Sequence, residues 1–190
     1  MSSLLLNRLP YLNEYTYLEL GVRNPEENFL QINCKEKFSV DLNGFGKYTG
    51  TTDEYFAQLS LDKKFDIIFI DANHDYDFVL RDFNNAIDHA TKWIMIHDMV
   101  PPNQEYAGSY WCSDSYKLLY YFLREEQFEL YTTKENFGLT FIKMPAKKVS
   151  PPPSYKDVSY EEFITYIHTS YKTYYTEDEL VKYFIEHRKF

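Results

Sequence analysis

The sequence predicts an α/β protein built on a mostly parallel sheet with an antiparallel edge strand, and three observations lead to that fold class. Apolar runs typical of buried strands alternate with segments of helical periodicity along most of the chain. One of these runs, Phe65–Ile70, is apolar everywhere except at Asp66, as in a strand that is covered on both faces. Late in the chain two strand-like segments follow each other without a helix between them, which is typical of an antiparallel hairpin.

The composition predicts one core domain with an acidic surface. The 190 residues are 44% hydrophobic, which is enough for one buried core and a small extension. Residues 1–145 hold 13 Lys and Arg against 22 Asp and Glu, whereas residues 146–190 hold 7 of each, so the net charge of −9 lies in the core. This charge disfavours nucleic acid as a partner, because affinity for phosphate backbones comes from clustered Lys and Arg.

The two cysteines and the hydropathy predict the surroundings of the protein. Cys34 and Cys112 are far apart in the sequence, and the chain shows no secretory leader and no apolar run of membrane-spanning length. We therefore expect a cytoplasmic protein with reduced thiols and no membrane association.

The first half of the core is predicted to alternate between strand and helix. Tyr17–Gly21 has the pattern of a short strand, and Pro25 with two following glutamates begins a helix that extends to about Ile32. Phe38–Leu42 is the next strand. Thr51 and Glu54 then have the spacing of a capping box, which predicts the start of a further helix.

The second half is predicted to continue in the same way. Its elements in order are a strand to Asp71, a helix through 78–87, a strand over 93–98, a loop over 99–110, a helix over 113–126, and hairpin strands over 128–132 and 137–143. The loop is long and lacks apolar periodicity, so we expect it to act as a lid or substrate loop.

A proline-rich segment divides the chain into a core domain over 1–145, a linker over 146–155 and a helical extension over 156–190. Two further capping boxes, Ser159 with Glu162 and Thr176 with Glu179, predict two short amphipathic helices in the extension. Their tyrosine-rich faces must be covered by the core or by a second copy of the chain, which would make a homo-oligomer; covering by the core is favoured.

Asp71 and His74 follow the most apolar strand directly. In open α/β sheets ligands bind in the crevice outside the carboxyl ends of the strands, so these two side chains are candidate ligand or catalytic groups. The alternative is that Asp71 caps the next helix and that His74 is a solvated loop residue.

Four segments together resemble the ordered motifs of class I S-adenosylmethionine-dependent methyltransferases, namely residues 17–23, 38–41, 65–76 and 94–98. The resemblance is greatest to the small-molecule O-methyltransferase branch, in which the fourth strand ends in Asp, two variable residues, His and a nearby Tyr, and the fifth ends in His-Asp. It spans roughly residues 15–145. It implies a Rossmann-like methyltransferase fold and methyl transfer from S-adenosylmethionine to a small-molecule acceptor, here a hydroxyl group.

The same resemblance implies which residues bind the cofactor. They are Glu19, Gly21, Val22, Arg23, Asp41, Leu42, Asp53 and Asp71. In such enzymes the loop after Glu19–Gly21 wraps the methionine part, Asp41 accepts hydrogen bonds from the ribose hydroxyls, and Asp53 lies near the adenine. A glycine permits close approach of the backbone, and one carboxylate can accept from both hydroxyls.

The catalytic residues implied by the resemblance are His74, Asp71, His97 and Asp98. His74 would be the general base that removes the acceptor proton, a role that suits an imidazole near neutral pH. Asp71 and Asp98 would be ligands of a divalent cation such as Mg²⁺, although Met99 stands where metal-dependent relatives have an Asn. His97 and Asp98 could instead form a structural pair that holds the loop.

The loop after the first strand contains one glycine where the usual motif has two or three. This argues against a nicotinamide-dinucleotide enzyme, which needs the full glycine pattern against its pyrophosphate. It also supports an alternative function, a catalytically inactive methyltransferase-like module that serves in binding or interaction. No motif in the sequence identifies the acceptor.

Overall fold

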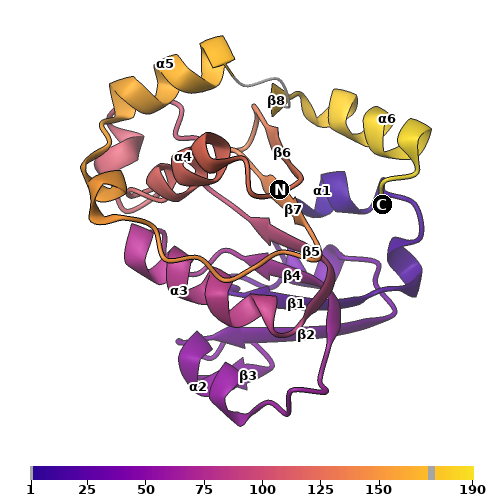
Figure 1. The fold of residues 1–190 in the computed structure, drawn as a ribbon. Helices are drawn as coiled ribbons and strands as arrows, with labels where there is room; N and C mark the ends of the chain where they lie inside the picture. Colours follow the sequence, from indigo (N-terminus) through magenta and orange to yellow (C-terminus); the bar gives the residue numbers. More distant parts are fainter. Residues whose placement is uncertain (1, 171–173) are drawn as a thin grey trace.

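Strands and helices alternate along the core of the protein, and two more helices follow it (Figure 1). The computed structural model describes residues 2–170 and 174–190. The elements are α1 (Ser2–Leu6), β1 (Thr16–Leu20), β2 (Glu36–Asp41), β3 (Tyr48–Thr49), α2 (Thr52–Gln58), β4 (Phe65–Ile70), α3 (Tyr76–Ile87), β5 (Ala90–Ile96), α4 (Tyr116–Glu125), β6 (Leu130–Thr133), β7 (Thr140–Lys143), α5 (Tyr160–Ser170), β8 (Tyr174–Tyr175) and α6 (Glu177–His187).

The strands form one sheet in the order β3-β2-β1-β4-β5-β7-β6-β8. Strands β2, β1, β4 and β5 are parallel to one another, and β7 runs antiparallel to both β5 and β6. The predicted fold class, a Rossmann-like sheet with an antiparallel strand near one edge, is therefore confirmed. The central position of β4, between β1 and β5, explains its almost unbroken apolar sequence.

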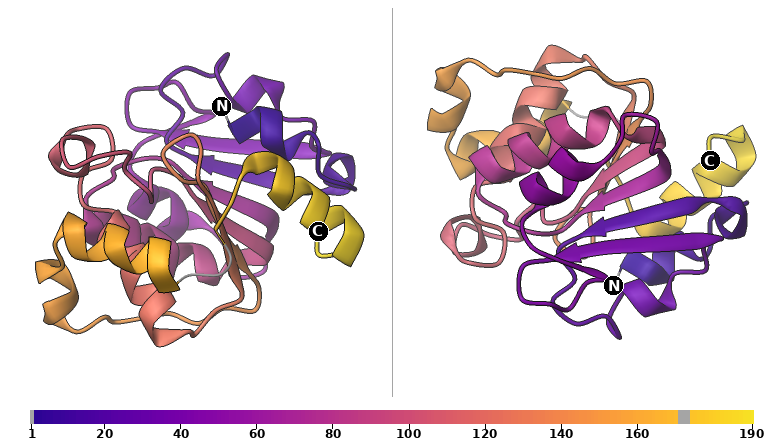
Figure 2. Two further views of the ribbon diagram at one scale, coloured as in Figure 1. Left: turned by 90° about the horizontal axis from the view of Figure 1, so that it is seen from above. Right: turned by 90° about the horizontal axis from the view of Figure 1, so that it is seen from below.

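Two layers cover the sheet, one on each face (Figures 1 and 2). On one face Ile68 and Ile70 of β4 pack in a cluster with residues of α2, α3, α4 and α5. On the other face Ile67 and Phe69 pack with residues of α1 and α6. Successive residues of a strand point to opposite faces, so this strand is buried on both sides.

The C-terminal helices pack on opposite faces of the same sheet. Phe163 of α5 is fully buried against the layer that contains α4, and Phe184 of α6 is fully buried with its ring 5.4 Å from that of Trp93. The chain's own core thus covers the apolar faces of both helices, the favoured of the two options. None of the helices in the described ranges has the length and hydropathy needed to cross a membrane.

The predicted helix over 25–32 does not form. That segment consists of turns and a short 3-10 helix, Phe29–Gln31, because the Asn28 side chain is drawn into tertiary hydrogen bonds. It accepts from the Ser3 N–H at 2.7 Å and donates to the Glu19 carboxyl at 2.9 Å. These long-range bonds outweigh the local helix signal of Pro25 and its glutamates.

Two other boundaries differ from the prediction for local reasons. Helix α4 begins at Tyr116 instead of near residue 113, because Ser113 has a φ of 45°. Strand β7 begins at Thr140 because Asn136, Phe137 and Gly138 all have positive φ and form the hairpin turn. The short N-terminal helix α1 was not expected from the sequence.

Candidate active site

The candidate site lies where β1, β4 and β5 end at a common edge of the sheet. The hydrogen-bond ladder continues one residue past two of these strands: Asp71 N donates to Leu20 O at 2.8 Å, and His97 N donates to Ile70 O at 3.0 Å. The loop after β4 is therefore held in register with β1, and the loop after β5 is held in register with β4. The strand order changes direction along the chain at this point, as in the ligand-binding crevices of other open α/β sheets.

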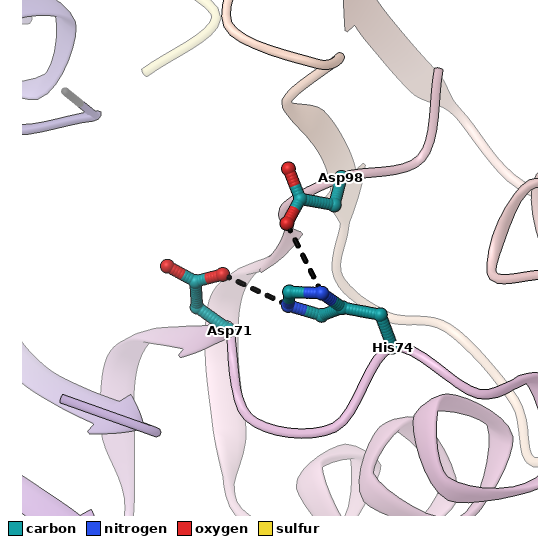
Figure 3. A group of neighbouring side chains, drawn as sticks. All are labelled: Asp71, His74 and Asp98. Carbon is teal, nitrogen blue, oxygen red and sulfur yellow. Dashed lines mark hydrogen bonds and ion pairs between the residues drawn. The ribbon is translucent and has the colours of Figure 1, made fainter. Parts of the chain in front are cut away.

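His74 lies between the carboxyl groups of Asp71 and Asp98 (Figure 3). Its Nε2 is 3.3 Å from Asp71 Oδ1, and its Nδ1 is 3.1 Å from Asp98 Oδ2. Nδ1 also contacts the backbone carbonyl oxygen of Trp111. The structure thus brings together the acidic and basic groups that the sequence predicted at the ends of β4 and β5.

His97 lies at the same two carboxyl groups. Its Nδ1 is 3.2 Å from Asp71 Oδ1 and 3.1 Å from Asp98 Oδ1, and its ring packs edge-on against Phe69. Asp98 has a left-handed backbone with φ of 58°, which a non-glycine residue adopts only when its surroundings hold it there. The Ser115 hydroxyl donates to the Asp98 carbonyl oxygen at 2.7 Å and helps to fix this conformation.

These contacts determine the protonation of the cluster. Burial would raise the pKa of Asp71, but the neighbouring His97 and His74 outweigh it and lower that pKa to about 2. Burial would lower the pKa of His97, but Asp71 and Asp98 raise it to about 10. The pKa of His74 is raised as well, again because both carboxyl groups outweigh burial. The two imidazoles are thus more basic than in water.

The donor atoms of Asp71, His74 and Asp98 are also close enough together to form a metal site. One donor atom from each lies within 4.8 Å of the other two, which is close enough for all three to reach one cation. Two carboxylates suit a hard divalent cation, while the nitrogen of His74 suits a softer one. The residues therefore fit a divalent cation held chiefly by Asp71 and Asp98.

The Asp41 carboxylate holds the loop that follows β1. Its Oδ2 accepts from the N–H groups of Val22 at 3.1 Å and Arg23 at 3.2 Å. Its Oδ1 accepts from the N–H groups of Asn43 at 2.7 Å and, weakly, Phe45 at 3.4 Å. Burial would raise the pKa of Asp41, but these four bonds outweigh it and lower that pKa. The side chain predicted to hold a ribose therefore also fixes its own loops.

Gly21 is required by a close approach between two loops. It has a φ of 82°, and a Cβ at this position would lie 2.5 Å from Ala72 Cα and would also clash with the Asp71 carbonyl. The one glycine of the motif thus brings the loop after β1 against the loop after β4. Arg23 also has a positive φ, 51°, although it is not a glycine, and its N–H donates to Asp41.

Three other predicted cofactor residues have surroundings of their own. Glu19 is 1% exposed and accepts hydrogen bonds from the Tyr17 hydroxyl at 2.7 Å and from Asn28, so it points into the core. Asp53 on α2 forms an ion pair with Arg81 of α3 at 3.0 Å. Leu42, by contrast, follows β2 with 66% of its surface exposed at the sheet edge.

The loop predicted as a lid over 99–110 extends to Asp114. Its last residues contact residues of the site. Asp114 accepts from the Tyr76 N–H at 2.6 Å, and the Arg23 guanidinium lies 5.8 Å from the Trp111 ring centre. The Trp111 carbonyl that contacts His74 was not identified from the sequence. It could not have been, because every residue carries such a group and only the fold selects one.

A family model described as a methyltransferase domain matches residues 33–99, a segment that contains Asp41, Asp71, His74 and Asp98. No curated protein matches the sequence.

Three solved structures share the fold. An O-methyltransferase from Bacillus cereus in complex with SAH has a TM-score of 0.54 and 10% identity, with 74% of this chain and 79% of that one covered. A candidate O-methyltransferase from Klebsiella pneumoniae has a TM-score of 0.53 and 12% identity, and the match covers 74% of this chain and 78% of that one. A candidate caffeoyl-CoA O-methyltransferase from Staphylococcus aureus has a TM-score of 0.53 and 11% identity, and the match covers 75% of this chain and 80% of that one.

Proposed function

We propose that this protein is a class I methyltransferase that transfers a methyl group from S-adenosylmethionine to a hydroxyl oxygen of a small molecule, a proposal supported by its fold and by the methyltransferase-domain match over residues 33–99. One observation carries the proposal beyond the family: His74 lies between Asp71 and Asp98 at the edge where β1, β4 and β5 end. This is a base at the ligand-binding edge of the fold.

The reaction needs positioning and the removal of one proton. An electron pair of the acceptor oxygen forms the new bond to the methyl carbon, and the bond from that carbon to the sulfonium sulfur breaks in line with it. The acceptor proton passes to a ring nitrogen of His74 when that ring is neutral. Asp71 and Asp98 then stabilise the imidazolium that forms, since both lie within 3.3 Å of it.

The cofactor would lie along the loops after β1 and β2. We propose that the ribose contacts Asp41 at Oδ1, where the bond to Phe45 N is long at 3.4 Å and leaves room for a hydroxyl donor. The exposed Leu42 offers an apolar surface for the adenine. The Bacillus cereus O-methyltransferase of similar fold was determined in complex with SAH, the demethylated form of the cofactor, which supports S-adenosylmethionine as the cofactor here.

Asp71 and Asp98 would hold the divalent cation that the donor set fits. Such a cation, when bound, would supply positive charge to the site. His74 remains the group that takes the proton, and we assign His97 to positioning because its Nδ1 contacts both carboxyl groups. Free thiols at Cys34 and Cys112 fit a cytoplasmic location.

The test is product formation with a panel of hydroxylated small molecules. Incubation with S-adenosylmethionine is expected to release S-adenosylhomocysteine and to add one CH₂ to an acceptor, as seen by mass spectrometry. His74→Ala should lose the product, whereas His187→Ala, an exposed histidine on α6, should keep it. Cofactor binding without any product across the panel would favour the alternative, a binding module on the methyltransferase fold.

A further inference from the structure

A cavity of about 530 Å³ lies at the same edge of the sheet, beside the loop that follows Asp98. Its lining comes from the start of the lid, from the turn between β6 and β7, and from α5 and β8 of the C-terminal segment. The lid wall begins at Val100, two residues after Asp98, so their Cα atoms are at most about 7.6 Å apart. The wall of the cavity is thus continuous in the chain with the segment that carries Asp98.

The walls of this cavity are fixed by hydrogen bonds. Val100 N donates to the Phe137 carbonyl oxygen at 2.7 Å, which joins the lid to the hairpin turn. The buried Tyr160 hydroxyl donates to the Pro101 carbonyl oxygen at 2.9 Å, which joins α5 to the lid. A site with walls set in advance loses less entropy when a ligand binds.

The lining combines aromatic rings with two nitrogen groups. Phe137, Tyr160 and Tyr174 supply the rings, which suit the flat or apolar body of a small molecule. The Lys134 ammonium lies 5.4 Å from the ring centre of Tyr174, and the ring of His168 packs edge-on against the same tyrosine at 6.1 Å.

The charge of the lining is opposite to that of the chain. The protein has a net charge of −9, yet the cavity is lined by Lys134 and His168 and by no Asp or Glu. In the ranges that the structure describes, neither side chain forms an ion pair. Such a pocket attracts an anionic group and offers it charge-assisted hydrogen bonds.

We propose that this cavity binds the methyl acceptor by an anionic group, a carboxylate or a phosphate, through Lys134 and His168. The aromatic rings hold the body of the acceptor, and its hydroxyl extends past Val100 towards His74. The inference rests on the proposed function, because it assigns the substrate class of that reaction. It also gives the C-terminal segment a role, since α5 and β8 complete the pocket.

The test is a binding experiment without any methyl donor. Isotope-labelled protein is titrated with para-hydroxybenzoate, phenyl phosphate and neutral phenol, and the amide signals are followed by NMR. We expect at least one anion to bind roughly tenfold more tightly than phenol and to shift the signals of Lys134 and Phe137. The tighter of the two anions identifies the group that the site recognises.

Variants separate the pocket from general surface charge. Lys134→Gln and, independently, His168→Gln should weaken binding of the anion about tenfold and leave phenol unchanged. Lys147→Gln is the matched control, because Lys147 is an exposed lysine outside the cavity. Equal binding of phenol and both anions, or identical effects of Lys134→Gln and Lys147→Gln, would overturn the proposal. Since no methyl donor is present, that outcome would leave the proposed methyl transfer intact.

Discussion

The Asp41 carboxylate accepts a hydrogen bond from the Val22 N–H at 3.1 Å, so the end of β2 holds the loop that follows β1. The second oxygen holds the loop of β2 itself through Asn43 N at 2.7 Å. These bonds restrict a short loop that contains only one glycine to one conformation. The Gly-poor motif is therefore compatible with an ordered cofactor loop.

Replacing Asp41 is expected to loosen both loops. In Asp41→Asn an NH₂ group takes the place of one acceptor oxygen and faces backbone N–H donors, so we expect a loss of about 1–3 kcal/mol of unfolding free energy. Denaturant titration measures it. Asp62→Asn, at an exposed site in a loop, is the control and should change little. Equal stability of both variants would show that the Asp41 bonds do not hold the loops.

Glu19 gives a pH-dependent prediction that is independent of catalysis. Burial raises the pKa of Glu19 to about 8, even though bonds from Tyr17 and Asn28 oppose the shift. The folded state then binds the proton more tightly than the unfolded state, whose pKa is near 4.5. Stability therefore falls as the pH rises from the unfolded value to the folded one.

We expect Glu19→Gln to remove this pH dependence. Each unit of raised pKa corresponds to about 1.4 kcal/mol. The free energy of unfolding of Glu19→Gln should therefore exceed that of the parent by at least about 2 kcal/mol at the alkaline end of the pH range and equal it at acid pH. Thermal melts across the pH range measure the difference. The exposed Glu105→Gln is the control. Parallel curves for parent and Glu19→Gln would mean that Glu19 is ionised in the fold.

His74 is predicted to act in turnover but not in cofactor binding. His74→Ala should lower kcat by about 100-fold or more, the usual contribution of a general base, while the Kd for S-adenosylmethionine changes little. Steady-state kinetics and calorimetry on the same preparation separate the two effects. A large loss of cofactor affinity with residual turnover would assign His74 to the cofactor pocket instead.

Asp98 is predicted to be a ligand of a divalent cation. Titration of the protein with Mn²⁺ should show one site, and Asp98→Asn should weaken it by at least about tenfold, because one of the two carboxylates is lost. Asp62→Asn again serves as control. Full activity in the presence of a chelator, with no measurable Mn²⁺ site, would leave Asp71 and Asp98 solely as partners of the two histidines.

Much of the site was predictable because it follows directly from local patterns. The apolar run of β4 and the polar residues that end it placed Asp71 and His74 at the sheet edge, and the His97-Asp98 pair marked the end of the neighbouring β5. Strand order then brings the two ends together. In a parallel sheet the carboxyl ends of the strands lie at one edge, so polar residues that follow different strands in the sequence meet in one site.

The remaining features depend on contacts between distant residues. The segment after Pro25 does not form the predicted helix, because the hydrogen bonds of Asn28 with Ser3 and Glu19 outweigh its local helix propensity. The use of Asp41 as a loop clamp and the Trp111 carbonyl at His74 both involve backbone groups, which have no sequence signature. Such contacts are set by the fold, so they could not be read from local sequence patterns.

Calorimetric titration of the unmodified protein with S-adenosylmethionine, and with S-adenosylhomocysteine, tests the central claim most directly. The account predicts one site per chain, and a ligand at about 100 times its Kd should raise the unfolding free energy by about 2.7 kcal/mol. An absence of heat and of stabilisation with either ligand at millimolar concentration would contradict a cofactor site along the loops after β1 and β2, and with it the proposed methyl transfer.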